Sequence, residues 1–230
     1  MDRVAALARI RVVLSHPSHP GNIGSAARAM KTMGLEELRL VAPKSFPDDA
    51  ADALAAGGID VLRQARVFSS LEEALGDVVL AVGFSARGRD LSHPPRALRE
   101  MAPLIVATAA ASPVALVFGN ETFGLTNEEL ARCQALAVIP ANPAYASLNL
   151  AAAVQVACYE VAAAAHAFAL PAEPGRTPAT VEEIEAFFAH LERAMIASGF
   201  LDPDMPKRLM ERMRRLFARA GLEREEVKFL

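Results

Sequence analysis

The sequence is poor in cysteine, and this excludes two kinds of protein. Its 230 residues include only Cys133 and Cys158, which are too few for a disulfide framework and lack the spacing of a metal site. His16 and His19 share a proline-rich loop, but no further cluster of ligand-type residues accompanies them. We therefore expect two reduced cysteines that pack in the interior, and a protein that holds no metal.

Long apolar runs and a secretory leader are also missing. The nearest candidate for a membrane span, residues 148–165, contains Asn149, Gln155 and Glu160, so we expect a buried helix there. The N-terminus, MDRVAALARIRVVL, has an acid at its second position and no small-residue cleavage pattern. These features predict a cytoplasmic protein without a membrane partner.

The chain lacks an excess of either charge, since 24 Lys and Arg face 27 Asp and Glu for a net charge of -3. This balance argues against bulk affinity for nucleic acid, although it hides local patches. One patch, within residues 85–99, contains Arg87, Arg89, Arg96 and Arg99. A second patch has six basic residues against the single acid Glu211: Lys207, Arg208, Arg212, Arg214, Arg215 and Arg219.

What the sequence does contain is 53% hydrophobic residues, enough for one substantial domain and a small appendage. The predicted strands are residues 10–14, 38–41, 66–68, 78–83, 114–118 and 136–139. The predicted helices are 23–33, 48–56, 71–75, one opened by Pro94-Pro95, 127–133 and one after Asn149. Asn22 is placed to cap the first helix and Gly34 to end it. The alternation predicts an α/β fold with a mostly parallel sheet covered on both faces.

The composition changes after Phe168. ALPAEPGRTPAT, residues 169–180, contains three prolines and a glycine, which is typical of a linker. Beyond it, 181–197 has apolar residues at helical spacing, and 206–220 forms a second expected helix that carries the six basic residues. The expected division is therefore an α/β domain at 1–168, a linker at 169–180 and a helical extension at 181–230.

Three polar turns follow predicted strands, whereas no phosphate-binding GxxxxGK[ST], GxGxxG or serine nucleophile motif is present. The turns are PGNIG at 20–24, with Arg28 one helical turn further on, FGNE at 118–121 and SLN at 147–149. Carboxyl ends of strands meet at one sheet edge, where open α/β proteins bind ligands. Each turn taken alone fits more than one role: GNIG also fits a phosphate-binding turn or the GxxG of an RNA-binding module, and Ser147 or Asn149 fits a helix cap.

Three segments together carry a resemblance. NIGSAARAMKTMG, ALVFGNETFGLTNEEL and IPANPAYASLNLAAAVQVACYE resemble, in this order, the three signature motifs of the SpoU branch of the SPOUT RNA methyltransferases, closest to its tRNA ribose methylases. The resemblance covers residues 10–168, and LDPDMPKRLMERMRRLF is similar to their helical extension. It implies a trefoil knot at the end of the α/β domain, S-adenosylmethionine as cofactor, a homodimer, and 2′-O-methylation of a pyrimidine ribose in the tRNA anticodon loop.

The resemblance also implies roles for individual residues. It places Asn22, Arg28, Ser147 and Asn149 at the reacting centre. Because arginine stays protonated, Arg28 suits stabilisation of the developing alkoxide better than it suits a base. The implied cofactor contacts are Phe84, Ser85, Ala86, Gly119, Asn120, Glu121, Ile139, Ala146, Ser147 and Leu148. The implied RNA contacts are Arg28, Arg87, Arg89, Arg96, Lys207 and Arg208.

Some alternatives stay open. The C-terminal basic patch fits a solvated helix face balanced by Glu223, Glu225 and Glu226 as well as it fits an RNA contact. Asn120 stands where the tRNA-modifying relatives carry arginine, which leaves ribosomal RNA or another tRNA ribose as the target. A non-catalytic RNA-binding relative is a third hypothesis. The chain ends at EEVKFL, short of the helix that usually closes these relatives.

Overall fold

Seven strands form one parallel sheet in the computed structural model, which describes residues 4–85, 94–167 and 177–230. The strand order is β3-β2-β1-β6-β4-β7-β5, and every pairing is parallel. The strands are β1 (Ile10–Ser15), β2 (Glu37–Val41), β3 (Arg66–Phe68), β4 (Leu80–Phe84), β5 (Arg96–Ala97), β6 (Val114–Phe118) and β7 (Ala135–Val138). The prediction of a mostly parallel sheet is confirmed, and the two-residue β5 is an addition to it.

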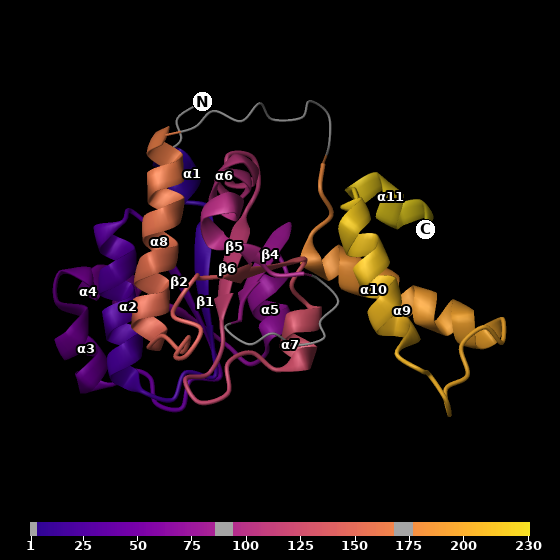
Figure 1. Cartoon of the computed structure of the whole chain (residues 1–230), viewed down its shortest axis with the longest axis horizontal. Helices are drawn as coiled ribbons and strands as arrows, with labels where there is room; N and C mark the ends of the chain where they lie inside the picture. The colour runs from indigo at the N-terminus through magenta and orange to yellow at the C-terminus, as the bar shows by residue number, and fades with distance from the viewer. Residues whose placement is uncertain (1–3, 86–93, 168–176) are drawn as a thin grey trace.

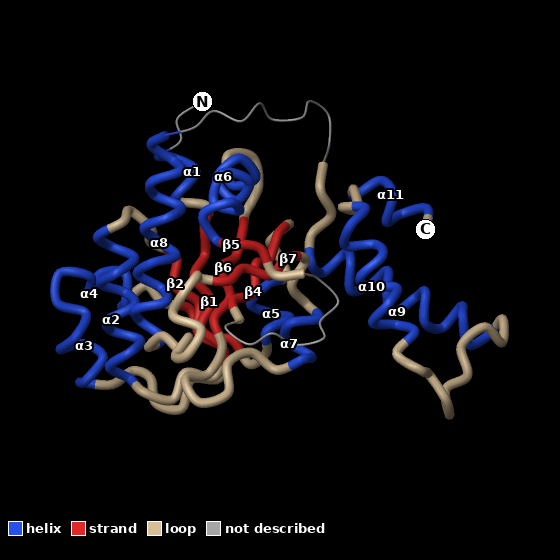
Figure 2. Tube along the Cα trace, viewed as in Figure 1, coloured by secondary structure: helices blue, strands red, loops and turns tan. Residues whose placement is uncertain are grey.

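Helices lie on both sides of this sheet (Figures 1 and 2). In chain order they are α1 (Val4–Leu7), α2 (Pro20–Thr32), α3 (Asp49–Ala55), α4 (Ile59–Arg63), α5 (Leu71–Leu75), α6 (Leu98–Ala109), α7 (Asn127–Ala131), α8 (Leu150–Ala167), α9 (Val181–Ala197), α10 (Leu209–Ala220) and α11 (Arg224–Phe229). The sequence did not predict α4 or α11. Gly58, which lies just beyond the predicted helix 48–56, occupies the N-cap position of α4.

Side chains of β1 alternate between the two faces of the sheet, as the pleat requires. Ile10, Val12 and Leu14 belong to the larger apolar cluster, which α2, α6 and α8 complete. Val13 belongs to a second cluster with side chains of α5 and α7. Both faces are therefore covered by apolar contacts, and only the strand ends are left for a binding site.

The start of α2 differs from the prediction. The helix begins at Pro20, with His19 at the N-cap position, so Asn22 lies inside the first turn and the expected Asn22 cap is wrong. Proline suits the first helical position because its φ is already helical and it has no N–H to satisfy. The predicted end is confirmed, since Gly34 follows Met33 with a φ of 78°.

The helix α8 is packed into the α/β domain, as the polar residues within it suggested. Val154, Ala157, Cys158 and Val161 are buried in the larger cluster. Burial also raises the pKa of the Cys158 thiol to about 12, so it remains protonated and unreactive. Among the described residues, no helix is long and apolar enough to cross a membrane.

The helical extension has a small core of its own, centred on Phe187, Phe188 and Leu222. Its first helix spans the predicted residues, Val181–Ala197. The extension is attached to the α/β domain at Val181, which is buried in the second cluster and donates its N–H to the carbonyl of Val78 (2.8 Å). Of the predicted linker, residues 169–176 lie outside the described residues. Ala179 is buried, and its N–H donates a hydrogen bond to the carbonyl of Leu222.

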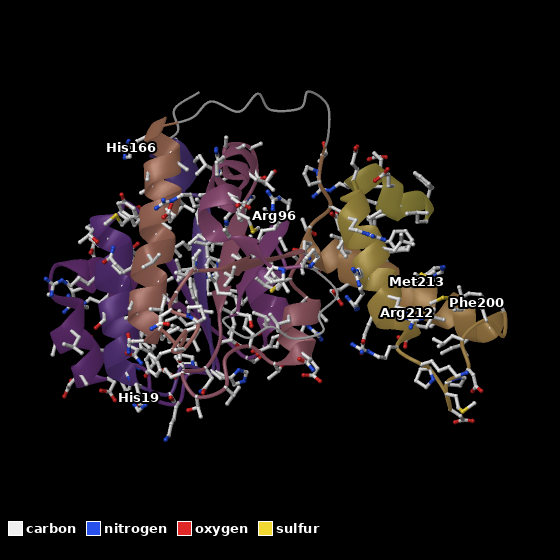
Figure 3. All side chains as sticks on the ribbon, in the orientation of Figure 1. His19, Arg96, His166, Phe200, Arg212 and Met213 are labelled. Carbon is white, nitrogen blue, oxygen red and sulfur yellow. The ribbon has the colours of Figure 1, made fainter. Side chains whose placement is uncertain are left out.

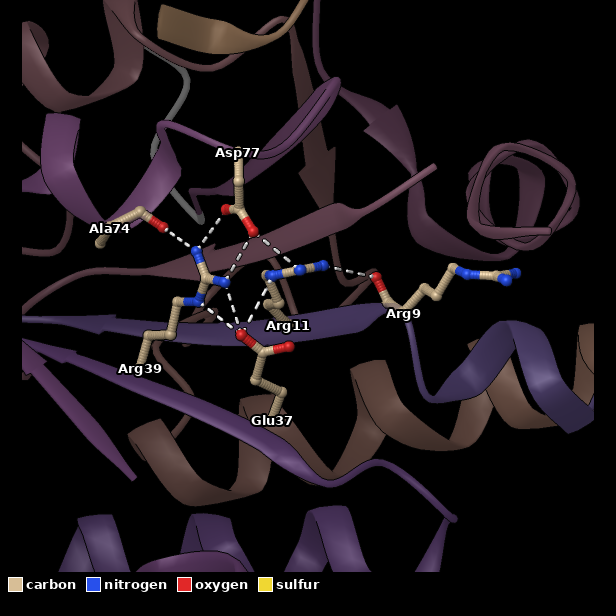
Figure 4. Close-up of polar contacts among 6 residues, drawn as sticks. All are labelled: Arg9, Arg11, Glu37, Arg39, Ala74 and Asp77. Carbon is tan, nitrogen blue, oxygen red and sulfur yellow. Dashed lines mark hydrogen bonds and ion pairs between the residues drawn. The ribbon is translucent and has the colours of Figure 1, made fainter. Parts of the chain in front are cut away.

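A charged cluster that the sequence did not predict lies on the sheet face next to α5 (Figure 4). Arg39 is 2% exposed and donates to Asp77 (2.7 Å) and to the carbonyl of Ala74 (2.6 Å). Arg11 donates to the other oxygen of Asp77 (2.8 Å), and Glu37 contacts both guanidinium groups. Burial would raise the pKa of Asp77, but its hydrogen bond from Arg39 and the charges of Arg39 and Arg11 hold it below its usual value.

We expect Asp77→Asn to lower the free energy of unfolding by about 1–2 kcal/mol, because it leaves two largely buried guanidinium groups with Glu37 as their only full counter-charge among the described residues. This expected loss of stability is smaller than that for a fully buried ion pair, because Asp77 is half exposed. Since the folded pKa of Asp77 is lowered, the stabilisation is present above its ordinary pKa of 3.8 and is lost as pH falls through the folded value.

Urea unfolding of both proteins at pH 7 and near pH 3 measures this difference, which should shrink at the lower pH. The control is Asp60→Asn, which removes an exposed partner of Lys31 and should leave the unfolding midpoint nearly unchanged. Equal stability of wild type and Asp77→Asn at pH 7 would contradict the role of the cluster.

Candidate functional site

A pocket opens at the carboxyl ends of the neighbouring strands β6, β4 and β7, with a cavity volume of about 150 Å³. It is lined by residues 84, 85, 118–125, 137, 139, 146–148, 150 and 153. All the predicted cofactor contacts that the structure describes are among them: Phe84, Ser85, Gly119, Asn120, Glu121, Ile139, Ala146, Ser147 and Leu148. Ala86 was also predicted and lies outside the described residues. The pocket thus occupies the sheet edge at which the sequence predicted a ligand site.

The pocket combines apolar walls with exposed backbone. The rings of Phe84 and Phe118 stack at 4.3 Å with an angle of 14° between their planes. Gly119 is required by the loop that follows, because a Cβ there would lie 2.1 Å from the carbonyl carbon of Gly124. The loop's own backbone therefore makes the close approach at Gly119. Such a pocket suits a flat, mostly apolar ligand with a few polar edges.

Glu121 joins the loop after β6 to the loop after β1. Its carboxylate accepts hydrogen bonds from the N–H (2.8 Å) and hydroxyl (2.7 Å) of Ser18, from the N–H of His19 (3.2 Å) and from the side-chain amide of Asn22 (2.9 Å). Asn22 then accepts a hydrogen bond from the side-chain amide of Asn149 (3.0 Å). The three predicted polar turns are therefore brought together, although they are far apart in the sequence.

Asn149 has two functions in this arrangement. Its Oδ1 accepts hydrogen bonds from the backbone N–H groups of Ala151 (2.9 Å) and Ala152 (3.3 Å), so it caps α8. Its amide nitrogen is the group that reaches Asn22. The alternative of a simple helix cap is thus correct for Asn149 but incomplete. Ser147 lines the pocket, is exposed, and makes no hydrogen bond with any described residue.

The hydrogen bonds to Glu121 fix its charge. Burial would raise the pKa of Glu121, but the hydrogen bonds from Asn22 and Ser18 outweigh it and lower the pKa from 4.5 to about 2. The group is therefore a carboxylate that only accepts hydrogen bonds at neutral pH, and it holds Asn22 in one orientation. Sequence reasoning proposed Glu121 as a cofactor contact and gave no sign of this network.

Arg28 is not brought to the pocket of its own chain. It follows Asn22 by six residues on α2, and at about 100° per residue the two side chains leave the helix about 120° apart. Arg28 is exposed and makes no hydrogen bond or ion pair with the described residues. The α2 backbone at Arg28 packs closely against Gly58.

The first basic patch is only partly described. Arg87 and Arg89 lie outside the described residues. Arg96 is exposed in β5, opposite Ala137 of the pocket, and Arg99 is bound to Glu160 (2.8 Å). Figure 3 labels Arg96 on the α/β domain, at a distance from Arg212 of the second patch on the helical extension.

The second patch separates into structural and exposed arginines. Arg214 donates to both carboxylate oxygens of Glu185 (2.6 and 2.8 Å) and lies over the ring of Phe188, and Arg208 donates to Glu211 (2.6 Å). A different group, which we call the α10 arginine face, is exposed, and its side chains make no hydrogen bond or ion pair with the described residues: Arg212, Arg215 and Arg219. Lys207 is also exposed.

The acids proposed to balance this patch have other partners. Glu225 pairs with Lys228 (2.7 Å), and Glu226 accepts the backbone N–H of Glu223 (2.8 Å) in the capping box of α11. Because the α10 arginine face lies along one side of its helix, at spacings of three and four residues, it presents a continuous positive stripe.

Two family models match the chain. The one described as the SpoU rRNA Methylase family matches residues 9–159, and the one described as the tRNA methyltransferase TrmJ, C-terminal domain, matches residues 182–230. A curated relative from Pseudomonas aeruginosa, named tRNA (cytidine/uridine/adenosine-2′-O-)-methyltransferase TrmJ, is 48% identical over 97% of this chain and 91% of its own length.

A second relative, from Escherichia coli K12, is named tRNA (cytidine/uridine-2′-O-)-methyltransferase TrmJ and is 49% identical over 97% of this chain and 93% of its own. The crystal structure of TrmJ from Z. mobilis superposes with a TM-score of 0.83 at 32% identity, covering 95% of this chain and 94% of that one. The similarity therefore extends through both the α/β domain and the helical extension.

The Glu121 network has a testable pH dependence. Because the folded pKa of Glu121 is lowered to about 2, its stabilising effect is fully present above its ordinary value of 4.5 and is lost as pH falls toward 2. The difference in unfolding free energy between wild type and Glu121→Gln should therefore be constant between about pH 5 and 8 and should narrow below about pH 4.

Denaturant unfolding across this pH range measures the difference. Glu36→Gln, a change at an exposed carboxylate near the end of α2, is the control and should show a much smaller difference at every pH. If the Glu121→Gln protein had the same unfolding free energy as wild type at pH 7, the stabilising role of the network would be contradicted.

Proposed function

Because the chain belongs to the SpoU methylase family and ends in the C-terminal domain of its TrmJ members, we propose that it is a tRNA 2′-O-methyltransferase that uses S-adenosylmethionine. The observation that carries this function is the hydrogen-bonded connection of Asn22, Glu121 and Asn149 beside the pocket. It joins the three family motifs into one site. The names of both relatives include cytidine and uridine, which supports a pyrimidine ribose as a target, and the name of the Pseudomonas aeruginosa relative adds adenosine.

The pocket fits the cofactor by its chemistry. Apolar walls from Phe84, Ile139 and Leu148 suit an adenine ring, and the backbone of the Gly119 loop offers polar edges. When bound, S-adenosylmethionine would supply a methyl group on a positively charged sulfur; in-line transfer of this methyl to the 2′-oxygen would leave a neutral thioether and would need no metal. The contribution required of the protein is positioning, and the Ser147 turn at the pocket together with Asn22 beside it suits that task.

Three finer features belong to the same proposal. A trefoil knot lies at the end of the α/β domain, and α8, which follows the Ser147 turn, is the segment drawn through it. The target ribose lies in the anticodon loop, where an unpaired nucleotide is accessible to a protein pocket. The reaction takes place in the cytoplasm, where such tRNA substrates are modified.

The protein acts as a homodimer in which Arg28 serves the pocket of the partner subunit. Its exposed position, turned away from Asn22 on α2, supports this arrangement. A face of α8 supports it as well, because Tyr159, which is 53% exposed, and Ala152, which is also exposed, lie seven residues apart on one side of a helix whose other side is buried in apolar contacts. A fixed guanidinium at the reacting 2′-oxygen would stabilise its developing negative charge.

Labelled methyl transfer to unmodified tRNA tests the function. We expect the wild-type protein to methylate tRNA, with 2′-O-methylated cytidine or uridine from the anticodon loop after digestion. Arg28→Ala should abolish transfer while S-adenosylmethionine binding, measured by calorimetry, persists. Lys31→Ala, which changes an exposed cation on the same helix, is the control and should stay active. Methylation of ribosomal RNA instead of tRNA would contradict the proposed substrate.

Mixing two inactive variants tests the dimer. An Arg28→Ala protomer paired with a Ser147→Ala protomer retains one complete site if Arg28 acts on the partner's pocket. Random exchange should then restore about a quarter of wild-type activity, since half of the dimers are mixed and each has one working site. Absence of any recovery from dimers that have exchanged subunits would place Arg28 and Ser147 in the same protomer's site.

The helical extension contributes to tRNA binding through the α10 arginine face. Unpaired, exposed guanidinium groups along one helix are suited to contacts with successive phosphates. Arg208 and Lys207 lie at the start of the same helix, and Arg96, with Arg87 and Arg89 of the first patch, extends the positive charge on the α/β domain. Arg214 is excluded from this role because Glu185 and Phe188 already hold it.

We expect Arg212→Gln with Arg215→Gln to weaken tRNA binding and to reduce the slope of log K against log salt by about 1 to 2, because two phosphate contacts are lost. Filter binding between low and moderate salt measures the slope. The matched control is Arg63→Gln with Arg66→Gln, which removes two exposed charges from the other end of the molecule. This double variant should keep the salt slope of the wild type. Equal slopes for the two double variants would exclude the α10 arginine face from the RNA contact.

A further inference from the structure

A second carboxylate, that of Glu129 on α7, is bonded to the end of β1, just before the loop that Glu121 holds. The hydroxyl of Ser15, a residue only 1% exposed, donates to Glu129 Oε1. The side chain of Glu129 is 12% exposed, and its other oxygen accepts the backbone N–H of Thr126 (2.6 Å). His16 Nδ1 lies 3.0 Å from the Ser15 hydroxyl oxygen. A buried hydroxyl and a nearly buried carboxylate are thus satisfied by each other.

The next residue connects this contact to the pocket. His16 has a φ of 50°, a conformation that costs a non-glycine residue about 1 kcal/mol or more and persists only when its surroundings hold it. Its N–H donates to the carbonyl of Val41 (2.8 Å), and its own carbonyl accepts the side-chain amide of Asn120 (2.8 Å). Asn120 lines the pocket. The conformation at His16 therefore sets the position of a pocket residue.

The loop at residues 15–19 is consequently held at both ends. Glu129 and Asn120 hold its beginning, at Ser15 and His16, whereas Glu121 holds its end, at Ser18 and His19. Asn22 follows directly after this loop and faces Glu121. The loop thus spans the distance between the pocket and the polar network beside it.

A purely structural role for Glu129 explains only half of its contacts. Glu129 belongs to the capping box of α7 with Thr126, and this box uses Glu129 Oε2 and the Thr126 hydroxyl. The cap does not require Oε1, which is the atom bonded to Ser15 from another part of the chain. The two functions of Glu129 can therefore be separated by mutation.

We propose that Ser15 and Glu129 are positioning residues for methyl transfer, which fix Asn120 at the cofactor pocket relative to Asn22 on the ribose side. The inference rests on the proposed function, and it adds two residues that touch neither cofactor nor RNA. A misplacement of about 1 Å at a reacting centre costs up to about a hundredfold in rate. The effect should appear mainly in kcat, because the apolar walls of the pocket and the RNA surface keep all their side chains.

The test compares Ser15→Ala with Thr126→Ala. Ser15→Ala removes the link between the loops and keeps the capping box, so kcat for tRNA methylation should fall about tenfold or more, with KM for S-adenosylmethionine and tRNA within about twofold of wild type. Thr126→Ala breaks the box and keeps the Ser15 contact. It should lower the thermal unfolding midpoint while kcat remains within about twofold of wild type. Glu129→Ala should show both the lower kcat and the lower thermal unfolding midpoint.

Amide hydrogen exchange provides a measurement that is independent of activity. In Ser15→Ala, exchange should accelerate at residues 16–19 and 119–122, whereas in Thr126→Ala it should accelerate only around α7. Unchanged exchange in the two loops of Ser15→Ala overturns the proposed connection, whether or not the enzyme is active. Unchanged kcat in Ser15→Ala, or equal loss in both variants, overturns the positioning role. A wild-type protein that transfers no methyl group contradicts the proposed function instead.

Discussion

The candidate site depends on one ionised carboxylate. Glu121 leaves the end of β6 and accepts four hydrogen bonds from the loop after β1 and from α2, and Asn22 continues the connection to the turn before α8. A partly buried carboxylate without these donors would be costly, and with them its pKa falls to about 2. Satisfying one charge therefore determines how three loops lie relative to one another. Glu121 therefore stays ionised, and able to accept these hydrogen bonds, throughout the neutral range.

The parallel sheet explains why those loops meet at all. In a parallel sheet every carboxyl end points to the same edge, and the strands β6, β4 and β7 are neighbours there although they are not consecutive in the chain. Apolar clusters cover both faces and leave that edge free. The Gly119 loop then folds back on itself, which requires a residue without a Cβ. A pocket of mixed apolar and backbone character follows from these constraints, and it agrees with the family to which the chain belongs.

Arginine has three different uses in this molecule, and its partners distinguish them. Arg39 and Arg11 are largely buried and share Asp77 with Glu37, so they serve the sheet. Arg214 is held by Glu185 and Phe188 within the helical extension. The α10 arginine face has no such partner in the described chain, and for this reason it is the part of the basic patch that we assign to RNA. Composition alone does not separate these residues, because they are all arginine.

The sequence by itself determined much of what depends on neighbouring residues, although it placed the cap of α2 wrongly at Asn22 and did not predict α4 or α11. Its alternation of strand and helix patterns predicted the parallel sheet, helical spacing predicted Val181–Ala197 to the residue, and Gly34 marked the end of α2. The second and third motifs contain most of the residues that line the pocket. Tertiary structure alone decided which side chains meet across long separations. The bonds from Asn22 to Glu121 and from Asn149 to Asn22 span 99 and 127 residues, and no local pattern encodes them. The same holds for the Asp77 cluster and for the exposed side of α10. Local propensity fixes how a segment folds, but burial and charge satisfaction between distant segments fix what each polar side chain does.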